Sequence, residues 1–89
     1  MRQLFTIALF QAALLVPALS YADQDVTLEQ LPPAVRATVD QETKGGVIKD
    51  IERDDKAGQV TYEVEFTLDG KAYELDIAED GKVIQKRLD

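Results

Sequence analysis

The distribution of apolar residues divides the chain into three stretches with different periods. Residues 4–16 form a nearly unbroken apolar run, residues 31–39 place apolar side chains three and four positions apart, and residues 47–88 largely alternate apolar with polar side chains. A spacing of three or four is typical of a helix with one buried face, and a spacing of two is typical of a strand with one buried face. The pattern therefore predicts a leading apolar segment, then one helix, then several strands.

The leading segment has the organisation of a secretory signal peptide. Arg2 precedes the apolar run, and the small residues Ser20 and Ala22 occupy positions −3 and −1 of a signal-peptidase site. The run is shorter than the roughly 20 apolar residues that span a bilayer. We therefore predict a signal peptide over residues 1–22 and an exported product, periplasmic or secreted, with no membrane span after cleavage.

The next stretch carries the start and stop signals of a helix. Residues 23–26 are a polar leader that we expect to fray. Thr27 and Gln30 fit a capping box, and Gly45-Gly46 supplies a left-handed end. The apolar stripe between these signals comprises Leu31, Ala34, Val35 and Val39.

The remaining stretch predicts four strands joined by tight turns. Asp69-Gly70 and Asp80-Gly81 are strong hairpin signals, and residues 55–58 form a four-residue loop before them. The strands run from Val47 to Arg53, from Val60 to Leu68, through Tyr73 to Ile77, and from Lys82 to Leu88. The expected fold over residues 27–89 is α+β, with one N-terminal helix packed on a four-stranded antiparallel β-meander.

Several short motifs at expected turn, cap and core positions follow one another along the chain. They are Leu31-Pro32, Tyr62-Glu63-Val64-Glu65, Asp69-Gly70-Lys71, Tyr73-Glu74-Leu75 and Asp80-Gly81-Lys82-Val83. Over about residues 27–84 the chain resembles the PepSY-like family of small periplasmic domains, also described as β-lactamase-inhibitor-like. The resemblance implies a helix-on-sheet envelope domain that binds or inhibits peptidases, because related domains occur in propeptides of secreted metallopeptidases. It implies no catalytic residues. Members often carry tandem copies, whereas this chain has one.

Composition restricts the chemistry that the exported part can perform. The full chain has net charge −7, and removal of Arg2 with the signal leaves 67 residues of net charge −8, without Cys, His, Ser, Met, Asn or Trp. Ser and Cys triads and thiolate or imidazole metal sites are therefore excluded. A domain of this size has little room for a substrate pocket, and its negative charge disfavours nucleic acid. We expect no enzymatic activity, no cofactor and no nucleic-acid partner.

Turn geometry predicts which residues face one another across the strands. A two-residue loop at Asp69-Gly70 pairs Glu65 with Glu74 and Glu63 with Asp76, and the four-residue loop places Asp50 beside Glu63. A two-residue turn at Asp80-Gly81 likewise opposes Asp76 with Gln85 and Glu74 with Arg87. Carboxylates directly opposed across strands repel one another. The candidate partner-binding surface on this acidic sheet face is formed by Asp50, Glu63, Glu65, Glu74 and Asp76.

The acidic face has three interpretations. It is a solvated outer surface with no partner, a docking surface for a basic protein such as a peptidase, or a weak site for a divalent cation. Calcium needs about 6–8 oxygen ligands, more than a flat strand face provides, which favours the protein partner. The functional hypothesis is a small exported, non-enzymatic binding module that binds or inhibits a peptidase. The alternative is a weak divalent-cation-binding or cation-sensing envelope protein.

The opposite face of the sheet is expected to hold the core. Alternation places Tyr62, Phe66 and Tyr73 against the helix rather than on a ligand platform. Lys86 falls on the same face of the last strand, where an inward-pointing charge discourages pairing with another sheet edge.

Overall fold

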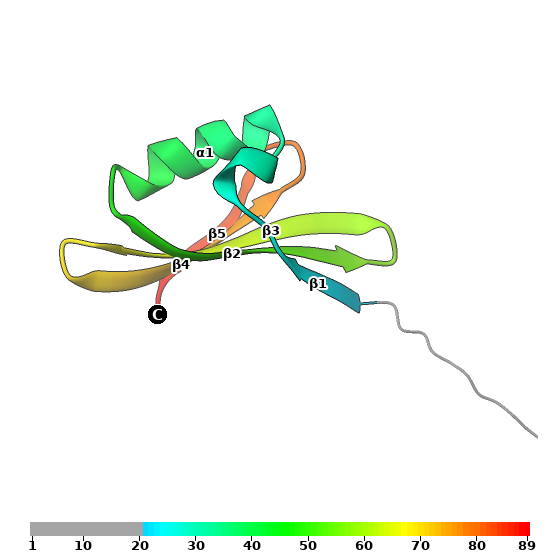
Figure 1. Ribbon diagram of the computed structural model, residues 1–89. Helices are drawn as coiled ribbons and strands as arrows, with labels where there is room; N and C mark the ends of the chain where they lie inside the picture. Colours follow the sequence, from blue (N-terminus) through cyan, green and yellow to red (C-terminus); the bar gives the residue numbers. More distant parts are fainter. Residues whose placement is uncertain (1–20) are drawn as a thin grey trace, which may run out of the picture.

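The computed structural model describes residues 21–89, so most of the predicted signal peptide lies outside the described residues. One α-helix covers one face of an antiparallel sheet with strand order β1-β2-β3-β4-β5 (Figure 1). The α+β class and the meander topology are confirmed. The elements are β1 Tyr21–Asp25, the 3-10 helix η1 Leu28–Gln30, α1 Pro33–Thr43, β2 Val47–Lys56, β3 Gln59–Leu68, β4 Lys71–Ala78 and β5 Val83–Leu88.

The sheet has five strands rather than the four predicted, and a strand precedes the helix. Residues 23–25, predicted to be a polar leader, form β1 together with Tyr21 and Ala22 and pair with β2. The pairing continues into Val26, whose N–H donates to the Ile51 carbonyl at 3.0 Å. This strand has no apolar alternation, so its signal is absent from the hydropathy pattern. The free backbone groups along the edge of β2 recruit it instead.

The entry to the helix follows the predicted capping pattern with one displacement. The Gln30 Oε1 accepts a hydrogen bond from the Thr27 N–H at 2.8 Å, as the capping box predicts. This bond closes η1, however, and α1 begins three residues later at Pro33, where proline suits the first helical position. At the other end, the left-handed cap is Lys44, with φ 51°, followed by Gly45.

The core lies between α1 and the inner face of the sheet. Phe66 and Tyr73 stack across β3 and β4 with ring centroids 5.3 Å apart. Ala34, predicted to belong to the buried stripe, is instead exposed. The Thr38 hydroxyl donates to the carbonyl of Gly81, so the β4–β5 turn is fastened to the helix at this point. The buried apolar residues are Leu31, Val35, Val39, Ile51, Val60, Tyr62, Val64, Phe66, Leu75 and Ile77.

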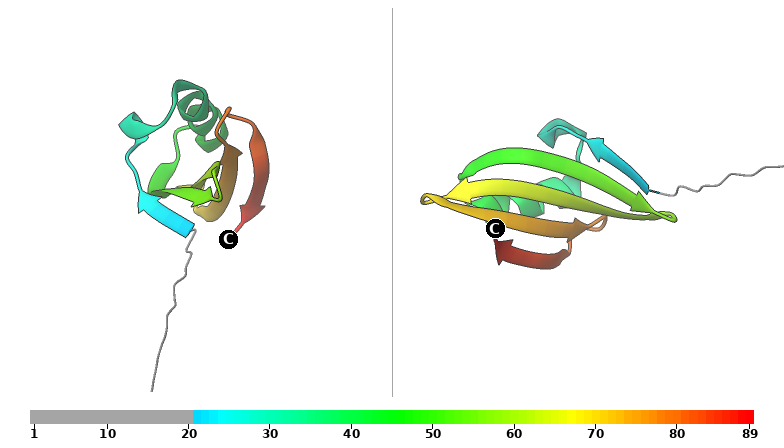
Figure 2. Two further views of the ribbon diagram at one scale, coloured as in Figure 1. Left: turned by 90° about the vertical axis from the view of Figure 1, so that its right-hand side faces the viewer. Right: turned by 90° about the horizontal axis from the view of Figure 1, so that it is seen from below.

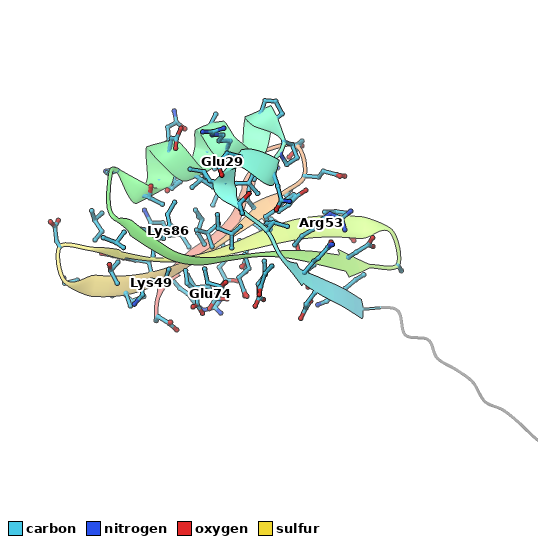
Figure 3. All side chains as sticks on the ribbon, viewed as in Figure 1. Glu29, Lys49, Arg53, Glu74 and Lys86 are labelled. Atoms are coloured by element: carbon cyan, nitrogen blue, oxygen red, sulfur yellow. The ribbon has the colours of Figure 1, made fainter. Side chains whose placement is uncertain are left out.

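Lys86 occupies the inner face of β5, as predicted (Figure 3). Its Nζ lies 3.2 Å from Glu42 Oε1 on α1. The same ammonium lies 5.9 and 5.7 Å from the ring centroids of Phe66 and Tyr73. Lys86 therefore connects the edge strand to the helix over the aromatic pair. Its role against edge pairing stays a prediction.

The register of β3 with β4 matches the prediction, whereas that of β2 with β3 does not. The β2–β3 turn contains two residues, Ala57 and Gly58, both with the positive φ that tight hairpin turns require. A β-bulge between Ile48 and Asp50 then shifts the start of β2. The shorter turn alone moves the pairing by two residues, so Glu63 faces Glu52 instead of Asp50, and the bulge lies beyond these pairs.

The β4–β5 turn departs from the predicted geometry without changing the predicted pairs. The Gly81 N–H donates to the Ala78 carbonyl, and the Ala78 N–H donates to the Lys82 carbonyl, which gives a three-residue turn instead of a two-residue one. An irregularity in the ladder at Ile84 compensates for the extra residue. The predicted pairs of Asp76 with Gln85 and of Glu74 with Arg87 are therefore retained.

Candidate binding site on the acidic sheet face

The face of the sheet that α1 leaves uncovered is dominated by carboxylates. Figure 2 shows this face from below, with β1 to β5 in order across it, and Figure 3 shows Glu74 and Lys49 on it. We name this surface the acidic face. Strand alternation and pairing place nine carboxylates on it: Asp23, Asp25, Asp50, Glu52, Asp54, Glu63, Glu65, Glu74 and Asp76.

The carboxylates form rows that run across the strands. The central row crosses four strands and comprises Asp25, Glu52, Glu63 and Asp76. A second row comprises Asp50, Glu65 and Glu74, and a third pairs Asp23 with Asp54.

All five predicted site residues therefore share one face, but Asp50 lies in the second row and not beside Glu63. Sequence reasoning missed four further members. Glu52 and Asp54 alternate with Ile51 and were detectable once the turn length was known. Asp23 and Asp25 belong to a strand without an apolar signal.

A cavity of about 360 Å³ lies across the sheet, lined by residues of the central row and of the third row. Ile84, placed here by the ladder irregularity of β5, gives it one apolar wall and is 55% exposed. The cavity thus combines an anionic lining with an aliphatic contact. Its lining residues are Asp23, Glu52, Asp54, Lys56, Thr61, Glu63, Asp76 and Ile84.

Glu63 has the most strongly perturbed acidity on this face. A hydrogen bond with the Glu74 carboxyl group, burial, and the charges of its neighbours raise the pKa of Glu63 from 4.5 to about 8. The protonated form of Glu63 is therefore favoured at neutral pH, and its hydroxyl donates to the Glu74 carboxylate.

Other carboxyl groups of the acidic face are perturbed in the same direction. Burial, then the charge of Glu74, raises the pKa of Asp76, and Arg87 opposes this shift. Burial, then the charge of Asp50, raises the pKa of Glu52. The direction is the same in each case because burial and neighbouring negative charges both disfavour the ionised carboxylate.

Arg87 and Lys56 form ion pairs with carboxylates of this face. The Arg87 Nη2 contacts Glu74 Oε1 at 2.6 Å, and Glu74 is only 9% exposed. The Lys56 Nζ lies 3.7 Å from Asp54 Oδ2. The other oxygen of this carboxylate, Asp54 Oδ1, is buried and has no hydrogen-bond partner within residues 21–89. The pairing of this face is therefore incomplete at its β1–β2 end.

Two carboxylate triads have the spacing that a divalent cation could bridge. One is Asp25, Asp50 and Glu52, and the other is Glu63, Glu74 and Asp76; in each, the side-chain oxygens lie within 4.8 Å of one another. Three carboxylates that each offer one oxygen supply fewer ligands than a calcium ion takes, so a bound ion would retain several waters. Arg87 already neutralises Glu74 in the second triad.

The fold has relatives among solved structures. A DUF2874 family protein from Bacteroides uniformis matches with a TM-score of 0.71 and 22% identity, over 78% of this chain and 54% of that one. A DUF2874 family protein from Bacteroides ovatus has a TM-score of 0.69 and 18% identity, over 78% and 52% of the two chains. A Bacteroides eggerthii protein whose name assigns it provisionally to the periplasm has a TM-score of 0.71 and 18% identity, over 78% and 53%.

The chain thus spans about half the length of these proteins, and at this identity the likeness concerns the fold alone. No protein-family model and no curated protein matches the chain. Among residues 21–89, no helix has the length and apolar character needed to cross a membrane.

Proposed function

We propose that this protein is a small exported, non-enzymatic binding module whose acidic face docks a basic segment of a partner protein. The observation that carries this proposal is the cavity that five carboxylates line together with one apolar side chain. An arginine or lysine side chain has the complementary chemistry, because its aliphatic stem packs on apolar surface and its charged group binds carboxylates. Ile84 would contact the stem, and Glu52, Glu63 and Asp76 would contact the charged group.

Export and the class of partner are parts of the same proposal. Export is supported by the secretory pattern of residues 1–22 and by the fold likeness to a protein provisionally assigned to the periplasm. A secreted peptidase is the partner that the PepSY-like resemblance favours. A basic patch on such a peptidase would be drawn to a surface of high negative charge.

The test uses the mature chain beginning at Asp23 and a hexa-arginine peptide, with calorimetry at low salt and above the pKa of Glu63. The site variant is Glu52→Gln/Glu63→Gln/Asp76→Asn. The matched control, Glu29→Gln/Asp40→Asn/Glu79→Gln, removes three carboxylates outside the acidic face. We expect the site variant to lose about tenfold or more in affinity and the control to lose about threefold or less, because exposed charges act weakly.

Equal losses in the two triple variants would overturn the docking site, since they would show attraction to overall charge alone. A calcium titration of the wild-type chain distinguishes the alternative function, cation binding, from docking of a protein partner. If hexa-arginine does not bind, but low-millimolar calcium raises the melting temperature and the site variant abolishes this effect, the face is a cation site and not a protein-docking surface.

A further inference from the structure

The predicted signal-peptidase site lies inside a strand. β1 begins at Tyr21, whereas cleavage after Ala22 would make Asp23 the first residue. Asp23 lies directly opposite Asp54 in the antiparallel register. Three residues further along β1 and its extension, the Val26 N–H donates to the Ile51 carbonyl, so Val26 and Ile51 form a hydrogen-bonded pair. Because the two kinds of pair alternate, Asp23 and Asp54 form a non-hydrogen-bonded pair, the kind that brings side chains closest.

These two carboxyl groups are poorly neutralised. A hydrogen bond that protonated Asp23 donates to the Asp54 carboxylate, and then the negative charge of Asp54, raise the pKa of Asp23. The Lys56 Nζ lies 3.7 Å from Asp54 Oδ2, and the Lys56 side chain is 64% exposed. The second oxygen, Asp54 Oδ1, is buried without a hydrogen-bond partner in the described part of the chain. A further cationic donor at this position would satisfy it.

We propose that cleavage after Ala22 supplies this donor, and that the new α-ammonium group of Asp23 pairs with the Asp54 carboxylate. Hydrolysis of the Ala22–Asp23 peptide bond consumes one water, leaves a carboxylate on Ala22, and leaves an amine on Asp23 that takes up a proton. In the intact strand the N–H of Asp23 points away from β2, because this pair is not hydrogen-bonded. The Cα atoms of such a pair are only about 4.5 Å apart, so rotation of the freed first residue about its Cα–C bond would bring the ammonium within reach of the Asp54 side chain. The inference rests on the proposed export, since it requires processing.

Processing then changes both the shape and the charge of the acidic face. The mature chain loses the pairs of Tyr21 with Lys56 and of Ala22 with Asp55. This end of β2 then has no neighbouring strand on its β1 side. In exchange, a positive charge enters the β1 side of the cavity, which Asp23 and Asp54 line. The central row, from Glu52 to Asp76, stays open to a partner. The unprocessed precursor has a neutral amide at Asp23 and lacks this ion pair.

The test compares four synthetic chains beginning at Asp23: wild type and Asp54→Asn, each with a free or an acetylated amino terminus. We expect acetylation to lower the melting temperature of the wild type by about 2–5 °C and to change that of Asp54→Asn by much less, because the ion pair is partly exposed. Asp25→Asn, two residues further along the same face, is the matched control and should retain the full effect of acetylation. By NMR, the α-amino group should titrate above its usual range of about 7.7–8.0 in the wild type only.

An equal acetylation effect with and without Asp54 would overturn the proposal, as would an unshifted α-amino titration. Mass spectrometry of the exported protein must also find Asp23 at its amino terminus, and a different first residue would likewise overturn it. These measurements use the chain without a partner. A failure of hexa-arginine binding with intact coupling between the terminus and Asp54 would therefore reject the proposed function alone.

Discussion

Carboxylates from two neighbouring strands surround Glu63. Glu52 faces it from β2, Asp76 faces it from β4, and Glu74 shares a hydrogen bond with it. The hydrogen bond with Glu74, burial, and the negative charges of these neighbours all favour the protonated form of Glu63, and together they raise its pKa to about 8. Replacement by glutamine keeps a similar shape and removes the titrating group. We expect Glu63→Gln to stabilise the chain at neutral pH by a few tenths to about 1 kcal/mol.

The pH dependence of stability follows from the direction of this shift. A folded-state pKa above the unfolded value of 4.5 means that the native state binds more protons between pH 4.5 and about 8. The contribution of Glu63 to stability is therefore fully present below pH 4.5 and is lost as pH rises through 8. Denaturant unfolding across this range should show a smaller decline for Glu63→Gln than for the wild type. Glu79→Gln, in the exposed β4–β5 turn, should follow the wild type, and parallel declines in all three chains would contradict the assignment.

Arg87 is the cation that makes the buried position of Glu74 tolerable. The contact is 2.6 Å, and the positive charge of Arg87 also opposes the upward shift in the pKa of Asp76. We expect Arg87→Gln to destabilise the chain at neutral pH by about 1 kcal/mol, a value limited by the exposure of the guanidinium to solvent. Because the cost arises from the uncompensated carboxylate, adding Glu74→Gln should recover most of it. Chemical denaturation of the single and double variants measures this, and a double variant no more stable than Arg87→Gln would contradict it.

At the scale of elements, the β3–β4 hairpin and the helix depend on one aromatic contact. Phe66 is fully buried under α1 and stacks on Tyr73 across the hairpin. Phe66→Ala should cost about 3–5 kcal/mol, which is about all the stability that a domain of this size has. Far-UV circular dichroism should therefore show a largely unfolded chain. Val47→Ala, at a 63% exposed position of β2, should remain folded, and a folded Phe66→Ala variant would refute the packing described here.

At the scale of the whole molecule, charge is segregated to the side of the sheet opposite the helix. A cation that docks on the acidic face competes with the proton on Glu63, because both are attracted to the same carboxylates. We therefore expect the affinity for hexa-arginine to rise between about pH 6 and pH 9. Calorimetry in buffers of different ionisation enthalpy should detect proton release on binding in this interval. The Glu63→Gln variant should lose this component, and an unchanged pH profile would place docking elsewhere.

Elements with local sequence signals, such as hydropathy periods and turn residues, follow from the sequence alone. Val35 and Val39 on the helix and the alternation from Val60 to Leu68 fix which faces are buried, because burial of apolar area is the dominant stabilising term. Asp69-Gly70 fixes the β3–β4 register, because its short loop allows one pairing. Consequently the pairs of Glu63 with Asp76 and of Glu65 with Glu74 could be predicted from the sequence.

Features that depend on contacts between distant segments follow from the assembled fold and not from local sequence signals. The two-residue turn at Ala57 exchanges Asp50 for Glu52 in the central row, and the bulge near Lys49 shifts the start of β2; neither has a distinctive sequence signal. β1 exists because the edge of β2 offers unpaired backbone groups, an interaction to which its side chains contribute little. The cavity combines β1, β2, β3, β4 and the displaced Ile84, and its geometry arises only when the sheet is assembled.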